Sequence, residues 1–392
     1  MLALFFLRPN LFGELLAPLG LTLAAGAAAV ELMSRRGQQI PMPPVRILLI
    51  VPVCVGLADA WKLVRFYVTM PEQLYAVLQD ILITVGTLIC VYIVCRTAQR
   101  RLALGRGFVI VVVLFSISYV LTALMWAAGG IGSGSYGAIP VGNVGPQPIF
   151  FPISVAESTQ SVLGQTFPRF TGLGREPGWM AMYCAAAYFM CPMVGIRSRL
   201  LKVCLLVALA GTWSTAGFGV FVVVWTYDIF IRSRPDWVGG LNFLRRVTGL
   251  AFLGGAAWVA INAPILGLSA KQTQNGISLR ERELATEAGL QALNESPFWG
   301  VSSSIRQLGI NLISDIEASG LPFVILITLA LLLPAVVQGR ARQGHAAVLA
   351  LFLTLLTSQP AGASTWVFAL ALIAYGCRDL TRANSAVRDP GV

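Results

Sequence analysis

The sequence predicts an all-α polytopic membrane protein. Of its 392 residues, 56% are hydrophobic and only 11% are charged, and the mean hydropathy is +0.76. Apolar runs recur along the chain, many of them close to the length of about 20 residues that crosses a bilayer as a helix. We therefore expect about 11 transmembrane helices, with about 10 to 12 as the range. The runs lie near 12–32, 46–63, 73–95, 107–128, 178–196, 200–213, 216–231, 246–268, 320–338, 346–357 and 362–377.

The basic residues between these runs predict the orientation. Cytoplasmic loops of membrane proteins collect Lys and Arg, and nearly all the basic loops here fall on one side of the expected spans. This places the C-terminus in the cytoplasm and explains the net charge of +11 without a nucleic-acid partner. The residues are Arg35, Arg36, Arg46, Arg96, Arg100, Arg101, Arg106, Arg197, Arg199, Lys202, Arg232, Arg234, Arg245, Arg246, Arg340, Arg342, Arg378, Arg382 and Arg388.

The same pattern divides the chain into five parts. The first thirty residues lack the basic start and cleavage site of a signal peptide, so we interpret them as a retained span. The runs 346–357 and 362–377 are short and fit either a helical hairpin or one broken helix. The parts are 1–128, N-terminal helices; 129–177, a first long outward loop; 178–268, central helices; 269–319, a second long outward loop; and 320–392, C-terminal helices and a cytoplasmic tail.

Cysteine and histidine give no support for a metal or a disulfide framework. All seven cysteines fall within apolar runs, without the pairing typical of zinc ligands. The chain has a single histidine, His345, among arginines at a loop end. We therefore expect neither a metal nor another cofactor.

The end of the first long loop carries the strongest candidate site. Arg169 and Arg175 precede an apolar run that begins at Pro177, and proline is favoured at the first position of a helix. The free backbone N–H groups of a helix start attract anions. With the two arginines they would form a positive site at the membrane surface, suited to a phosphate or diphosphate.

Two residues of this stretch leave alternatives open. Glu176 is the best-placed carboxylate to act as a base, but it could equally cap the helix that starts at Pro177. Arg175 fits either a phosphate contact or a simple partner of Glu176.

Residues 279–295 of the second long loop predict a short amphipathic helix. Glu283, Glu287, Gln291 and Asn294 fall on one polar face, whereas Arg282 falls on the packed face with Ala285, Gly289 and Leu293. Arg280 has Glu283 as a local partner, but no carboxylate lies three or four residues from Arg282. Arg282 therefore either binds an anion at the membrane surface, pairs with a distant carboxylate such as Glu176, or extends along the helix toward water.

The order of these motifs resembles the O-antigen polymerase and O-antigen ligase superfamily. The matching residues are Arg169, Gly172 and Pro177; Ser214 and Gly217; Arg282 followed by Pro297-Phe-Trp-Gly300-Val; and Asn311, Glu317 and Gly320-Leu321. The resemblance covers roughly residues 165–325 through motifs and implies the GT-C-like architecture of that superfamily. Members transfer a glycan from undecaprenyl diphosphate to a sugar hydroxyl on the periplasmic face of the bacterial inner membrane, without metal or nucleotide.

The resemblance implies roles for individual residues. Arg169 and Arg282 match the arginines that engage the diphosphate, and we expect them to meet at one diphosphate. Arg175, Arg280, Gly172 and Asn311 would contribute substrate contacts, and Glu317 is a weaker candidate base than Glu176. The implied partners are a lipid-linked oligosaccharide, membrane lipid, a chain-length regulator and a flippase.

The ligase branch has a histidine directly before the Asn of its motif, whereas this chain has Ile310 there. This difference, and the Gly174-Arg-Glu-Pro-Gly178 variant, favour a glycosyltransferase of the polymerase branch that makes exopolysaccharide, capsule or O-antigen. A ligase or a protein-directed oligosaccharyltransferase is the alternative within the superfamily. A secondary transporter is the alternative outside it, although Asp80 is better explained by a hydrogen bond between helices.

Overall fold

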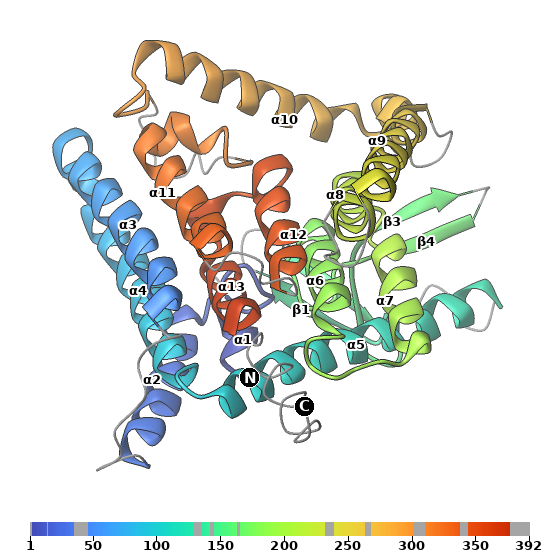
Figure 1. Ribbon diagram of the computed structural model, residues 1–392, viewed down its shortest axis with the longest axis horizontal. Coiled ribbons are helices and arrows are strands. Elements are labelled where there is room, and N and C mark those ends of the chain that lie inside the picture. Colours follow the sequence, from blue (N-terminus) through green and yellow to red (C-terminus); the bar gives the residue numbers. More distant parts are fainter. Residues whose placement is uncertain are drawn as a thin grey trace.

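A computed structural model shows a mostly helical protein with one small sheet (Figure 1). It describes residues 2–13, 15–34, 46–128, 135–141, 145–162, 165–231, 239–262, 268–301, 310–337 and 344–376. The helices are α1 (Ala3–Phe6), α2 (Ala17–Met33), α3 (Ile50–Thr69), α4 (Leu74–Val94), α5 (Ala98–Ala127), α6 (Pro177–Met190), α7 (Arg199–Gly211), α8 (Thr215–Thr226), α9 (Gly239–Asn262), α10 (Leu268–Glu295), α11 (Asp315–Val337), α12 (Gly344–Thr357) and α13 (Thr365–Gly376).

Several of these helices have the composition of membrane spans. Within the described residues, four helical stretches are long and apolar enough to cross a bilayer: Ile47–Thr69, Pro71–Val94, Gln99–Ala127 and Asp315–Val337. Shorter apolar helices cover Ala17–Met33, Thr215–Phe230, Gly344–Thr357 and Thr365–Gly376. The expectation of a helical membrane protein is thus met, whereas the number of eleven spans and the GT-C-like architecture stay predictions.

The short runs near the C-terminus form two helices rather than one broken helix. α12 and α13 are separated by residues 358–364, which include a single turn of 3-10 helix at Ala361–Ala363, and the two helices pack against each other. They therefore form the hairpin that was one of the two expected arrangements.

The first long loop contains a β-sheet, so the expectation of an all-α fold was wrong there. Strands β1 (Gly137–Val141), β2 (Gly145–Phe150), β3 (Ser154–Val162) and β4 (Gln165–Phe170) pair in chain order, and each pair is antiparallel. The prolines in this stretch argue against strands when only the sequence is considered, because proline has no N–H to donate to a ladder. Pro140 of β1 lies opposite Pro146 of β2, and Pro148 of β2 lies opposite Ala138 of β1. These pairs occupy alternate register positions, and alternate pairs of an antiparallel ladder exchange no hydrogen bonds.

The helix that follows the sheet is a central element of the fold. α6 lies between α12 and α7 in Figure 1, and nearly all its side chains are buried. Trp179, Met180 and Tyr183 are among the largest completely buried side chains. At Gly217 of α8 a Cβ atom would collide with Ala181, so that glycine allows α8 to pack closely on α6. Core packing on all sides therefore fixes the start of α6 and the turn before it.

α10 lies across the ends of other helices, from α11 toward α9 (Figure 1). It is longer than the short helix expected from the sequence, but the faces over 280–295 are as predicted. Glu283, Glu287, Gln291 and Asn294 are exposed, whereas Gly289 and Ala292 are buried and Arg282 is partly buried. At Gly289 a Cβ atom would collide with the carbonyl oxygen of Ile313, so α10 lies directly on the residues that lead into α11.

Some expectations fall outside the described residues. These concern Arg35, Arg36, Arg232, Arg234, Arg340 and Arg342, the segments 129–134 and 302–309 of the long loops, and the C-terminal tail from residue 377 onward.

Candidate active site

A bulge in the sheet places Glu157 opposite Arg169. In the β3–β4 ladder Ala156 pairs with Phe170 and the next pair is Thr159 with Pro168, so two residues of β3 face one residue of β4. Those two are Glu157 and Ser158, and the single residue is Arg169. Bulges of this kind re-aim a side chain and occur often beside active sites. No local pattern points to Glu157, because the composition of the stretch around it predicts a loop.

The turn after β4 is locked onto the sheet. Gly172 has φ +51, and a Cβ atom there would lie 2.7 Å from Met180 Sδ and 2.7 Å from the Phe170 ring. The Thr171 hydroxyl lies 2.9 Å from Gln147 Oε1, and Gln147 Nε2 donates to the Arg175 carbonyl at 2.6 Å. Gln147 and Thr171 are both buried. Gly172, expected to contact substrate, therefore has a structural reason for being glycine.

The N-terminal segment completes this turn. Leu11 N donates to the Leu173 carbonyl and Arg175 N donates to the Pro9 carbonyl, both at 3.1 Å. Asn10 forms a β-bridge with Gly174, and its side chain accepts a hydrogen bond from the Tyr183 hydroxyl at 2.5 Å. The backbone of Gly174 and Arg175 is thus held between the sheet and a segment from the start of the chain, a contact that no sequence pattern indicated.

Glu176 occupies the position before α6 but does not cap it. Its backbone is extended, with φ −138 and ψ 155, and its side chain makes no capping hydrogen bond. Glu176 Oε1 instead lies 3.6 Å from Arg175 Nε, and the Glu176 side chain is 37% exposed. Glu176 therefore does not cap α6 through its side chain, and its other role, as a base, stays a prediction. The pairing fits one of the two roles considered for Arg175, and a phosphate contact of Arg175 stays a prediction.

Arg282 lies close to this turn although it comes from the second long loop. Burial lowers the pKa of Arg282, the negative charge of Glu176 raises it, and the positive charge of Arg169 lowers it again. Glu281 also raises the pKa of Arg282, but more weakly. These charges interact only if the side chains are near each other. The structure thus places Arg169, Glu176 and Arg282 near one another, and the meeting of the two arginines at one diphosphate stays a prediction.

Glu157 belongs to the same cluster. Burial raises the pKa of Glu157, Arg169 lowers it, and Glu176 raises it. The cluster therefore includes Glu157 on β3, Arg169 on β4, Glu176 at the start of α6 and Arg282 on α10. Within the described residues, neither Glu157 nor Arg282 forms a direct ion pair, and the buried Nε of Arg169 has no hydrogen-bond partner. Guanidinium groups placed in this way retain donors for an anion.

The remaining candidates lie on the elements that support α10. The Asn311 amide donates to the Thr286 hydroxyl at 2.9 Å, and Asn311 Oδ1 accepts from Ser314 N at 2.9 Å. Asn311 is buried, and its side chain fixes α10 to the turn before α11. Glu317 is partly exposed in the first turn of α11, and Arg280 is exposed on α10. A substrate contact of these three residues stays a prediction.

An aromatic pair anchors the turn after α10. The Trp299 ring stacks on Trp61 of α3 with ring centroids 5.0 Å apart, and Arg65 donates to the carbonyl oxygens of Trp299 and Ala318. Gly300 and Gly320 both have positive φ, and added Cβ atoms would collide with the backbone of the other segment. The motif from Pro297 to Val301 is therefore clamped between α3 and the first turn of α11.

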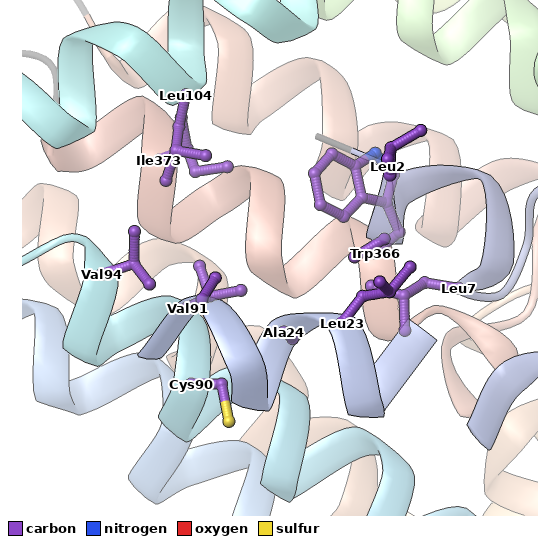
Figure 2. A pocket seen from close by; sticks show the side chains of 12 residues that line it. Leu2, Leu7, Leu23, Ala24, Cys90, Val91, Val94, Leu104, Trp366 and Ile373 are labelled. Atoms are coloured by element: carbon purple, nitrogen blue, oxygen red, sulfur yellow. The ribbon is translucent and has the colours of Figure 1, made fainter. Parts of the chain in front are cut away.

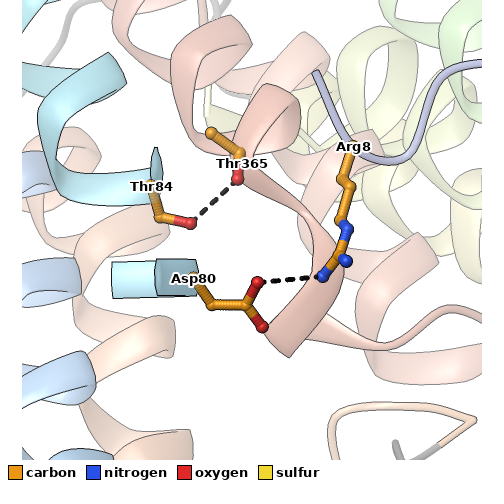
Figure 3. A network of polar contacts seen from close by, with 4 residues as sticks. All are labelled: Arg8, Asp80, Thr84 and Thr365. Atoms are coloured by element: carbon orange, nitrogen blue, oxygen red, sulfur yellow. Dashed lines mark hydrogen bonds and ion pairs between the residues drawn. The ribbon is translucent and has the colours of Figure 1, made fainter. Parts of the chain in front are cut away.

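Asp80 is used differently from what the sequence suggested. It accepts a hydrogen bond from Arg8 at 3.2 Å, so it forms an ion pair with the N-terminal segment and not a hydrogen bond between helices (Figure 3). The hydrogen bond between helices is made one turn later, where the hydroxyls of Thr84 and Thr365 lie 2.9 Å apart (Figure 3). The prediction missed this because Arg8 lies before the first apolar run.

A separate cavity lies between α1, α2, α4, α5 and α13 (Figure 2). It has a volume of about 390 Å³ and is lined only by apolar side chains and a cysteine, among them Leu7, Leu23, Val91 and Trp366. None of the candidate site residues lines it, so this cavity is not the charged site.

No family model, curated protein or solved structure matches this chain. Within the described residues, no group of three or more His, Cys, Asp or Glu side chains could hold a metal ion.

Proposed function

We propose that this protein is a membrane glycosyltransferase that moves a glycan from a lipid diphosphate to a sugar hydroxyl. The observation that carries the proposal is the meeting of Arg169 and Arg282, from two loops far apart in the sequence, beside two carboxylates. Two neighbouring guanidinium groups attract an anion that can contact both of them. A diphosphate has the charge and the oxygen atoms to contact both guanidinium groups.

The same pair of cations would promote departure of the sugar. When the bond between the anomeric carbon and the diphosphate breaks, negative charge grows on the leaving oxygen. Fixed guanidinium groups stabilise that charge without having to reorganise during the reaction. Arginine suits this role better than lysine because it grips phosphate through two parallel hydrogen bonds.

The resemblance to the O-antigen polymerase and ligase superfamily supports the same reaction. It adds undecaprenyl diphosphate as the carrier, the outer face of the bacterial inner membrane as the location, and another lipid-linked repeat unit as the acceptor. Ile310, in place of the ligase histidine, favours polymerisation over ligation.

The test is the size profile of lipid-linked glycans in cells that lack the wild-type protein and express a variant in its place. Arg169→Ala and Arg282→Ala are each expected to leave the protein inserted but to make single repeat units accumulate on the lipid carrier. Arg199→Ala is the matched control, because Arg199 is exposed at the start of α7 and should not affect polymer length. Long polymer in both site variants would refute the proposal.

A further inference from the structure

Glu157 and Glu176 act on each other within this cluster, and the two carboxylates differ in surroundings. Glu176 is paired with Arg175 at 3.6 Å and is 37% exposed. Glu157 is partly buried, and within the described residues its carboxylate makes no hydrogen bond or ion pair. A carboxylate without a bonded partner keeps its lone pairs for a substrate proton.

The position of Glu157 relative to Arg169 also matters. The bulge sets the two residues opposite each other across β3 and β4, close enough for their charges to interact but without a direct ion pair. In glycosyl transfer with inversion, the group that binds the leaving side and the base lie on opposite sides of the anomeric carbon. An inverting transfer therefore needs the cation on the leaving side and the carboxylate base to be separated, as Arg169 and Glu157 are.

The electrostatic environment suits the same role. The charges that act on Glu157 are Arg169 on β4 and Glu176 before α6, whereas the neighbouring strand β2 has no titratable side chain. From α5, Tyr119 stacks on Phe170 beside this position. Burial raises the pKa of Glu157 above the ordinary value of 4.5, which makes its carboxylate a stronger base.

We propose that Glu157 is the catalytic base that removes the proton from the acceptor sugar hydroxyl. This inference rests on the proposed function. The Glu157 carboxylate takes the proton of the hydroxyl while the hydroxyl oxygen bonds to the anomeric carbon. The bond from that carbon to the diphosphate oxygen breaks, and its electron pair leaves with the diphosphate, next to Arg169 and Arg282. The proton on Glu157 then passes to water.

The test uses the full-length protein in liposomes, with the lipid-linked repeat unit isolated from cells that lack the protein. Glu157→Gln keeps the shape of the side chain and removes the base. We expect kcat to fall about 10²–10⁴-fold, the contribution typical of general-base catalysis, without a rise in KM for the donor. Glu283→Gln makes the same chemical change on the exposed face of α10 and should behave as the wild type.

Azide distinguishes a base from a structural residue. Azide is already an anion and needs no deprotonation, so it should restore donor consumption in Glu157→Gln and form a glycosyl azide. It should not restore Arg169→Ala, which lacks the leaving-group cation. Wild-type kcat in Glu157→Gln, or a loss of activity that azide leaves unchanged, would each overturn the assignment.

A second variant covers the case in which Glu157→Gln does not fold. Glu157→Asp keeps the charge but withdraws the carboxylate by one methylene, and kcat is expected to fall about 10²-fold because of this displacement. An unchanged kcat in Glu157→Asp would contradict a base at this position. Different outcomes would contradict the proposed function itself. These are a wild-type protein that does not consume the lipid-linked unit, or arginine variants that remain active.

Discussion

The positive charge of Arg169 lies close enough to Arg282 to lower the pKa of the second guanidinium, although one residue ends a sheet and the other lies on a long helix. Two elements fix this proximity. β4 and the locked turn position Arg169, and the contacts of Gly289 and Asn311 position α10. Both arginines are thus held in place before any ligand arrives, which lowers the ordering cost of anion binding.

Replacing either arginine with lysine should reduce activity, because lysine keeps the charge but loses the two parallel hydrogen bonds. Removing the cation altogether with alanine should cost more, about 10²–10³-fold in kcat, as for loss of one donor to a developing oxyanion. Initial rates of polymer formation by the purified protein measure both effects. Equal rates for Arg169→Lys and the wild type would contradict bidentate binding.

Glu176→Gln should shift the acid limb of the pH–rate profile. The negative charge of Glu176 raises the pKa of Glu157, so its removal lowers that pKa and the base form exists at lower pH. Activity in the wild type should rise with pH through a midpoint above 4.5, and the variant should have its midpoint at a lower pH. The measurement is kcat/KM against pH. A shift toward higher pH, or complete loss of activity at every pH, would point to Glu176 as the base instead.

Gly172→Ala should destabilise the protein. The position has φ +51, and the new methyl group would lie 2.7 Å from Met180 Sδ and from the Phe170 ring. We expect a loss of about 1–3 kcal/mol in the free energy of unfolding, from backbone strain and crowding together. Thermal unfolding of the purified protein measures it. Gly137→Ala is the control, since nothing lies within 4 Å of the added atom, and an equal Tm for the two variants would contradict this explanation.

Gln147→Ala should loosen the turn that precedes α6. The change leaves the Arg175 carbonyl and the Thr171 hydroxyl without the Gln147 side chain. A buried polar group that loses its partner costs about 1–3 kcal/mol, so Tm should fall and donor KM should rise. Gln291→Ala, on the exposed face of α10, is the control. Unchanged donor KM in a folded Gln147→Ala protein would show that the turn does not position the binding groups.

The sequence predicted the helices and the charged cluster better than it predicted what connects them. Pro177 marked the start of α6, and the spacing of polar residues gave the faces of α10, because both signals are local. The sheet was missed because prolines in β1 and β2 suggest a loop when their strand partners are unknown. Glu157 was missed for the same reason, since its importance depends on the register between β3 and β4. The pairing of Arg8 with Asp80 is also a long-range contact that no local pattern contains.

The β-bridge between Asn10 and Gly174 has a consequence for biosynthesis. During translation the segment from Pro9 to Leu11 leaves the ribosome well before Leu173 to Arg175. The backbone groups of Pro9 to Leu11 therefore stay without these hydrogen-bond partners until Leu173 to Arg175 emerge. The turn at Leu173 to Arg175 can then close only after α1 to α5 and the sheet have been made, so the position of these two segments can be set before the remaining helices are complete.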